Sequence, residues 1–154
     1  MTEDTPASYR RYCQLLAAGG TVATIALLAL DGLRVDQTLG VVALGAVISA
    51  VLGTVADQGR TAMSLLHLPA LAAAYVCSAP VAPVLGAALA VFDNRRYGRW
   101  VAMGNAGTLA LSGAAAVGAV RGGGALWGGA DPGTGVWFLT AAAGAAAFMT
   151  VNHG

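Results

Sequence analysis

Polar side chains inside long apolar runs are the residues of this sequence that could do chemistry. Ser64 and His67 lie one helical turn apart, and Asn105, Thr108 and Ser112 follow one another at spacings of three and four. Residues at these spacings share one face of a helix. Because histidine titrates near neutral pH and all five side chains form hydrogen bonds, a pocket between two such helices would contact a ligand or respond to protonation. The simpler interpretation is that these side chains hydrogen-bond one helix to another.

The residue patterns that enzymes use for catalysis do not occur in the sequence. Neither His67 nor His153 has a partner at metal-ligand spacing, and no pair of carboxylates lies within an apolar run. The glycine run 122–124 lacks the lysine that follows a phosphate-binding loop. Cys13 and Cys77 lie in apolar runs without a CxxC spacing, so we expect buried thiols. We therefore expect a protein that is not an enzyme and that has no cofactor or metal.

A second pattern concerns packing, because small residues recur every four positions near the end of the sequence. This small-residue stripe consists of Ala106, Ala110, Ala114, Gly118 and Gly122. Small side chains at this spacing allow two helix backbones to approach closely in a membrane. We expect the stripe to pack against another helix of the same chain, and the alternative is that it forms the interface of a homodimer.

The composition predicts that these helices lie in a lipid bilayer. Of the 154 residues, 57% are hydrophobic and 10% are charged, and the mean hydropathy is +0.70. Soluble domains contain about 25% charged residues. The formal charge is only +1, so no basic surface is large enough to indicate a nucleic acid partner.

Charged residues divide the chain into apolar stretches of the length that membrane helices need, which is about 20 residues. A charge at the centre of the bilayer costs about 2.5–3.5 kcal/mol, so charged residues are expected to mark helix ends. We expect an all-α, polytopic transmembrane helical bundle that forms a single domain at 13–152, after a cytoplasmic tail at 1–12. The six expected spans are 13–30, 37–56, 61–78, 81–93, 100–120 and 134–151.

Proline and glycine set two of these boundaries. Pro80 and Pro83 interrupt the run 61–92, so the third and fourth helices are expected to be short and separated by a break. Five spans are the alternative if this pair does not cross the membrane twice. The glycine run after Arg121 is expected to end the fifth helix.

The arginines predict the orientation of the bundle. With six spans and a cytoplasmic N-terminus, only Arg34 and Arg121 lie outside the cell. The other six arginines are then cytoplasmic, as positive charges in membrane proteins usually are: Arg10, Arg11, Arg60, Arg95, Arg96 and Arg99. Both termini are therefore expected in the cytoplasm. The Arg10–Arg11 pair also resembles a twin-arginine signal, but no convincing cleavage site follows, so we expect an uncleaved first span.

The order of several segments resembles a known family. The segments are 60–74 (RTAMSLLHLPALAAA), the break at Ala79 and Pro80, 84–90 (VLGAALA), the arginine-rich turn at 95–99 and 105–112 (NAGTLALS). Together with the last run, they resemble the N-terminal membrane module of bacterial HD-GYP phosphodiesterases and GGDEF diguanylate cyclases over about residues 38–154. The resemblance implies a multi-pass sensor or anchoring module in the bacterial cytoplasmic membrane, followed by a cytoplasmic output domain. The sequence has neither a GGDEF run nor an HD pair, so no catalytic residue is carried over.

Three functions remain open from the sequence. The first is a non-catalytic sensor or anchoring module that signals through a partner or a missing output domain. The second is a small-solute binding or transport subunit that uses the broken third and fourth helices. The third is a structural subunit of a membrane complex. The expected partners are the lipid bilayer, a second copy of the chain, and a membrane or cytoplasmic signalling protein.

Overall fold

Six segments of the chain are helical in the computed structural model, which describes residues 5–56, 63–94, 97–126 and 142–147. Side chains are described over these ranges except at 53–56, 63–67 and 123–126. The helices are α1 (Ala7–Asp31), α2 (Gln37–Ala56), α3 (Met63–Val76), α4 (Val81–Asn94) and α5 (Arg99–Leu126), followed by a short helix at 142–147. No strand occurs within these ranges, so the predicted all-α fold is confirmed.

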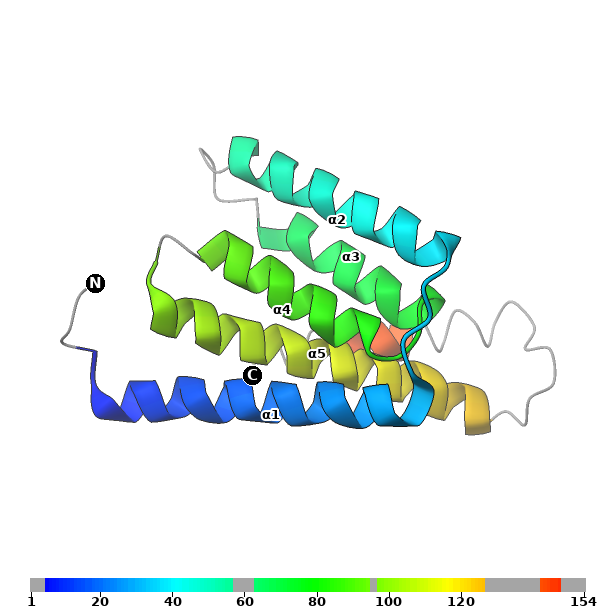
Figure 1. Cartoon of the computed structure of the whole chain (residues 1–154), viewed down its shortest axis with the longest axis horizontal. Coiled ribbons are helices and arrows are strands. Elements are labelled where there is room, and N and C mark those ends of the chain that lie inside the picture. The colour runs from blue at the N-terminus through cyan, green and yellow to red at the C-terminus, as the bar shows by residue number, and fades with distance from the viewer. Residues whose placement is uncertain (1–4, 57–62, 95–96, 127–141, 148–154) are drawn as a thin grey trace.

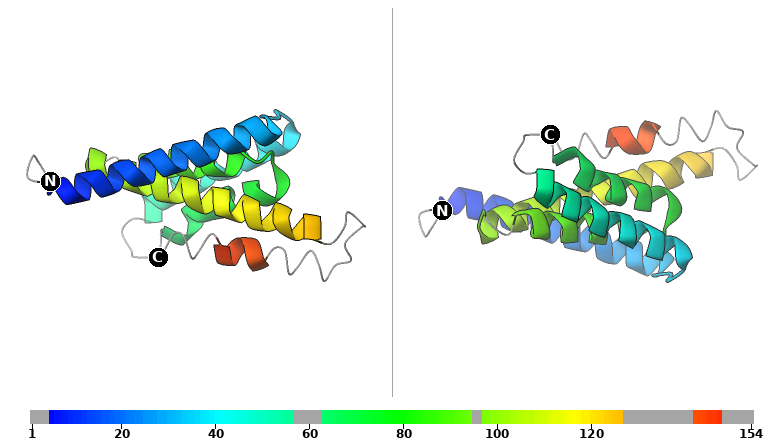
Figure 2. Two further views of the ribbon diagram at one scale, coloured as in Figure 1. Left: turned by 90° about the horizontal axis from the view of Figure 1, so that it is seen from below. Right: turned by 90° about the horizontal axis from the view of Figure 1, so that it is seen from above.

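The five long helices lie side by side in the order α2, α3, α4, α5, α1 (Figure 1). Helices that follow one another in the sequence run in opposite directions. Helices α1 and α5, which are neighbours in space, therefore run in the same direction (Figure 2). One end of the bundle contains the first residues of α1, α3 and α5, and we call it the Arg99 end. The opposite end contains their last residues and the α3–α4 turn, and we call it the Asp31 end.

The break between α3 and α4 lies where the prolines predict it. Val81 donates its N–H to the Ser78 carbonyl at 3.0 Å, which closes a tight turn around Pro80. Pro83 lies in the first turn of α4, where a missing N–H costs nothing because the helix has no partner for it there. Both helices have 14 residues. At 1.5 Å per residue each is about 21 Å long, which is shorter than the apolar core of a bilayer.

Small side chains form the core of the bundle and bring α5 close to its neighbours. Ala73 of α3, Ala82 of α4, and Ala116 and Val117 of α5 are all at most 1% exposed. On the other side of α5, a Cβ atom at Gly107 would overlap the α1 backbone. The stripe therefore lies only partly at the contact: Ala110 packs against Gly20 of α1, but the closest approach is at Gly107, outside the stripe.

Glycines set the register of the parallel α1–α5 pair. Gly20 of α1 faces Gly107 of α5, where an added Cβ would lie 3.0 Å from the Gly107 carbonyl oxygen. One further contact lies toward the Arg99 end, where the Cys13 sulfur would be 2.9 Å from a Cβ at Gly104. Cys13 is 1% exposed, so the thiol fills the space that the glycine leaves.

Glycines also bring α4 against α5. An added Cβ at Gly113 would lie 2.8 Å from the backbone of Ala82 and Pro83, and one at Gly86 would lie 2.9 Å from the Leu109 carbonyl oxygen. Helix α5 therefore packs by backbone approach on both sides, as small residues permit in membrane helices.

Two helices extend beyond the boundaries expected from the sequence. Helix α1 begins at Ala7 rather than at residue 13, so residues 7–12 of the expected tail are helical and Arg10 donates its N–H to the Pro6 carbonyl at 3.1 Å. Charges limit where a helix can be buried in lipid, but they do not prevent it from extending into water. Helix α5 continues past Arg121 to Leu126 because each glycine keeps its N–H and costs only about 1 kcal/mol in a helix.

The sixth expected span falls partly outside the described residues. Of the range 134–151, the structure describes the helix at 142–147. Within the described part of the chain, two helices are long and apolar enough to cross a membrane, namely Ala7–Asp31 and Arg99–Gly122. The apolar helices Gln37–Leu52 and Val81–Asn94 are shorter.

The α1–α5 contact predicts a position-specific effect of adding one methyl group. Gly107→Ala should lower the free energy of unfolding by about 1–3 kcal/mol relative to Gly118→Ala, because a Cβ at Gly107 meets the α1 backbone and one at Gly118 meets open space. Both changes give the same gain in helix propensity. Thermal unfolding in mild detergent, followed by circular dichroism, measures the difference, and equal melting temperatures for the two variants would contradict this packing.

Candidate functional site at the Asp31 end

A glycine ends α1 and fixes the position of Asp31. Gly32 has a φ of +69°, a region that side-chain-bearing residues rarely adopt, and its N–H donates to the Leu28 carbonyl at 2.9 Å. The chain then turns toward α2, where the Asp36 carboxylate accepts the Leu39 N–H at 2.9 Å and caps the helix. Asp31 is therefore held at the last position of α1, pointing toward the α3–α4 turn.

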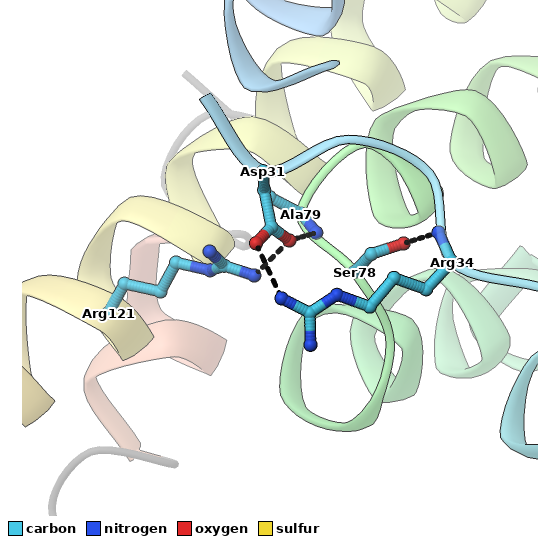
Figure 3. Close-up of polar contacts among 5 residues, drawn as sticks. All are labelled: Asp31, Arg34, Ser78, Ala79 and Arg121. Carbon is cyan, nitrogen blue, oxygen red and sulfur yellow. Dashed lines mark hydrogen bonds and ion pairs between the residues drawn. The ribbon is translucent and has the colours of Figure 1, made fainter. Parts of the chain in front are cut away.

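The Asp31 carboxylate joins three parts of the chain (Figure 3). Its Oδ2 accepts the Ala79 N–H at 2.8 Å and a hydrogen bond from Arg121 Nη2 at 2.7 Å. Arg34 Nη2 lies 3.6 Å from Oδ1. We call Asp31, Arg34, Ser78, Ala79 and Arg121 the Asp31 junction, because they connect α1, the α3–α4 turn and α5 at one end of the bundle.

A second hydrogen bond connects the two loops of the junction. The Arg34 N–H donates to Ser78 Oγ at 3.2 Å, and Ser78 is buried. Because Ala79 also donates to Asp31, the α3–α4 turn is attached to the end of α1 through two adjacent residues. The turn also precedes the N-terminus of α4, where the helix dipole favours a nearby carboxylate.

The two arginines of the junction are not equivalent. The Asp31 side chain is 13% exposed, whereas Arg121 is 47% exposed and Arg34 is 74% exposed. The Arg121 hydrogen bond, and then the Ala79 N–H, lower the pKa of Asp31 to about 2, well below its usual value of 3.8. Asp31 lies just beyond the uncharged stretch 13–30, outside the expected span. The long, exposed Arg34 contact contributes little.

The junction is suited to holding helices together rather than to bond-breaking chemistry. Its carboxylate is already occupied by strong donors and is ionised, so it is a poor acid at neutral pH. The nearby Cys77 is a free, half-buried cysteine. No group of side chains that could hold a metal ion occurs among the described residues.

The polar residues singled out in the sequence lie away from this junction. Asn105 donates its Nδ2 to Asn94 Oδ1 at 2.9 Å, and Asn94 donates to the Ala90 carbonyl at 2.9 Å, so a polar contact joins α4 to α5. Ser64 and His67 belong to α3, but their side chains are outside the described residues.

The other two polar residues of α5 bond within their own helix. Thr108 Oγ1 donates to the Gly104 carbonyl at 3.1 Å, and Ser112 Oγ donates to the Thr108 carbonyl at 2.9 Å. Ser112 is fully buried. Asn105 therefore forms a hydrogen bond to a neighbouring helix, whereas the hydroxyl groups of Thr108 and Ser112 donate to carbonyl groups of α5 itself.

The small-residue stripe is divided between packed and open positions. Ala110 is buried against Gly20 of α1, whereas Gly118 and Gly122 have no atom within 4 Å of an added Cβ. Ala106 packs against the core, and Ala114 is half-buried. The residues that make the closest approaches, such as Gly107, do not follow the four-residue repeat.

Sequence reasoning placed Asp31 and Arg121 at helix ends but did not pair them. The two residues are 90 positions apart. The sequence did indicate that they could pair, because they have opposite charges and lie on the same side of the membrane in the expected topology. Which of Arg34 and Arg121 binds Asp31 closely depends on where α5 lies against α1, and composition does not contain that information.

A double-mutant cycle tests the Asp31–Arg121 interaction. Asp31→Asn and Arg121→Gln should each lower the melting temperature by a few degrees, and the double variant should lower it no further than the worse single variant. The amide oxygen of the asparagine variant can still accept the Ala79 N–H, so the cycle isolates the charge pair. Arg34→Gln is the matched control and should leave the melting temperature unchanged, since its contact is long and exposed. Additive effects would show that the pair is not coupled.

The lowered pKa of Asp31 predicts a loss of stability in acid. Because the folded-state value is about 2 and the ordinary value is 3.8, the contribution of Asp31 is fully present above pH 3.8 and is lost as the pH falls to about 2. Melting curves of the wild type and of Asp31→Asn should therefore differ at neutral pH and converge toward pH 2. A constant difference across this range would exclude the ion pair as its source.

No family model, no curated protein and no solved structure matches this chain. The Asp31 junction is accordingly interpreted from its own geometry.

Proposed function

We propose that this chain is a multi-pass protein of the bacterial cytoplasmic membrane that acts as a non-catalytic sensor or anchoring module. In this proposal six helices cross the bilayer, both termini are cytoplasmic and the Asp31 end faces outward. The observation that carries the membrane placement is an exposed apolar band around the bundle with the described charges at its two ends.

The apolar band is widest on the two edge helices. On α1 the exposed large side chains include Leu15, at 73%, and Ile25, at 59%, and on α2 they include Val41, at 70%, and Val47, at 60%. These helices lie at opposite edges of the bundle (Figure 1). Soluble monomers rarely expose apolar patches of more than a few hundred Å², so apolar faces on both edges favour lipid as the surrounding medium.

The described charges support the same placement. Arg10, Arg11 and Arg99 are exposed at the Arg99 end, and Arg34 and Arg121 lie at the Asp31 end. The excess of arginine at the Arg99 end favours that end as the cytoplasmic one. In this proposal α1 takes the chain out of the cytoplasm, and the sixth span returns it there.

The packing of α5 favours a role in passing on structural change. This helix contacts α1, α3 and α4, and it carries Arg121 of the junction near its far end. A signal that alters the outer junction would change the packing of the helix that leads toward the C-terminal part of the chain. Such coupling requires two packing states with different affinities for the signal or partner. The resemblance to membrane modules of cyclic-dinucleotide signalling proteins agrees with this role.

Single cysteines at opposite ends test the membrane placement. In a Cys77→Ser background, Val35→Cys, in the α1–α2 loop, should react with a membrane-impermeant maleimide in intact spheroplasts. Tyr97→Cys, in the α4–α5 loop, should react only after permeabilisation. Both native side chains are exposed, so burial does not explain a difference, and Cys13 is buried. A fluorescent protein fused to the C-terminus should remain at the membrane and fluoresce.

The reversed labelling pattern would overturn the orientation. Equal labelling of both cysteines in intact spheroplasts, or a chain that is monodisperse in buffer without detergent, would overturn the membrane placement itself. A C-terminal fluorescent protein that stays dark after correct labelling of both cysteines would overturn the cytoplasmic placement of the C-terminus.

A further inference from the structure

The short helix at 142–147 packs against the bundle at a glycine. Gly144 is buried, and an added Cβ there would meet the hydroxyl group of Tyr75 in α3 and would lie 2.9 Å from a methyl group of Val120 in α5. Figure 2 shows the short helix alongside the second half of α5 in both views. The contact between this helix and the bundle therefore leaves no room for a larger residue at position 144.

Tyr75 also makes a polar contact with this helix. The backbone of Ala145 is hydrogen-bonded to the Tyr75 hydroxyl group. Because a tyrosine hydroxyl group loses water when it packs among apolar side chains, a polar partner there favours one packing arrangement over others. Tyr75 thus combines a steric contact at Gly144 with a hydrogen bond at Ala145, and we call these two interactions the Tyr75 contact.

The Tyr75 contact lies next to the Asp31 junction along α3. This helix ends at Val76, and Ser78 and Ala79 of the junction follow within four residues of Tyr75. The Ala79 N–H donates to the Asp31 carboxylate at 2.8 Å. A movement of the α3–α4 turn away from Asp31 would therefore move the last turn of α3, which contains Tyr75.

A second connection between the junction and the short helix runs along α5. Val120, which contacts Gly144, directly precedes Arg121, and Arg121 donates to the Asp31 carboxylate at 2.7 Å. Backbone hydrogen bonds fix the relative positions of neighbouring residues in a helix, so Val120 and Arg121 move together. Both side chains that pack on Gly144 are therefore close in sequence to a residue of the junction.

We propose that the Asp31 junction controls whether the helix at 142–147 is docked on the bundle. While the junction is closed, the ends of α3 and α5 hold Tyr75 and Val120 in position against Gly144. When the junction opens, these helix ends shift and the short helix is released, because packed interfaces exchange between discrete arrangements. The coupling is reciprocal, so loss of the Tyr75 contact weakens the junction by the same free energy. This inference rests on the proposed signalling role, and it gives the route from the junction to the C-terminal part of the chain.

Hydrogen–deuterium exchange of the full chain in mild detergent tests the coupling in both directions. Asp31→Asn should speed the exchange of the amides at 142–147 about fivefold, and Arg121→Gln should have the same effect from the other side of the ion pair. Tyr75→Phe keeps the ring but removes the hydroxyl group. It should speed the exchange of the Ala79 N–H about threefold, although Tyr75 lies outside the junction.

Two controls separate this coupling from a general loosening of the bundle. Arg34→Gln removes the long, exposed contact to the same carboxylate and should leave exchange at 142–147 unchanged. The amides at 103–108, toward the Arg99 end of α5, should exchange at the same rate in every variant.

Three results would overturn the coupling. They are unchanged exchange at 142–147 in both Asp31→Asn and Arg121→Gln, an unchanged Ala79 rate in Tyr75→Phe, and an equal increase at 103–108. These exchange rates do not depend on which side of the membrane the junction faces, so the cysteine-labelling test decides the proposed placement separately.

Discussion

The close parallel contact between α1 and α5 is the constraint on which the rest of the structure depends. Gly107 allows the α5 backbone to reach the α1 backbone, and Gly20 completes the contact from the other helix. Once these helices lie in parallel, the end of α1 is beside the last turns of α5, so Asp31 can reach Arg121 across 90 residues of sequence. The same contact places both helix N-termini at the opposite end.

Asp31 carries its negative charge at an electrostatically unfavourable end of α1. At the Asp31 end, the C-terminus of α1 disfavours a carboxylate, because the helix dipole is negative there. Asp31 remains ionised because Arg121 and the Ala79 N–H stabilise its charge, which is why its pKa is low rather than high. The ion pair is thus local compensation for an acid at an unfavourable helix end, and it ties the α3–α4 turn to the bundle at the same time.

The sequence predicted the elements of this fold better than their contacts. Length, charge and proline positions gave an all-helical chain with a break at Pro80, because these features act locally. Helix ends were less accurate: α1 starts earlier because exposed charges such as Arg10 do not end a helix, and α5 passes through its glycines because no proline stops it. Ala110 of the small-residue stripe lies at the α1 contact, but the closest approach uses Gly107, outside the stripe, since register depends on the partner helix.

The candidate site was harder to predict because it is made of separated single residues. Asn105 was identified from its helical spacing, but its partner Asn94 is on another helix and belongs to no pattern in the sequence. Asp31 and Arg121 looked like ordinary charges at span ends, and only the α1–α5 register shows that they meet. In an apolar bundle with few charges, each charged residue has few possible polar partners. Its partner is therefore set by how the helices are paired, as Arg121 is for Asp31.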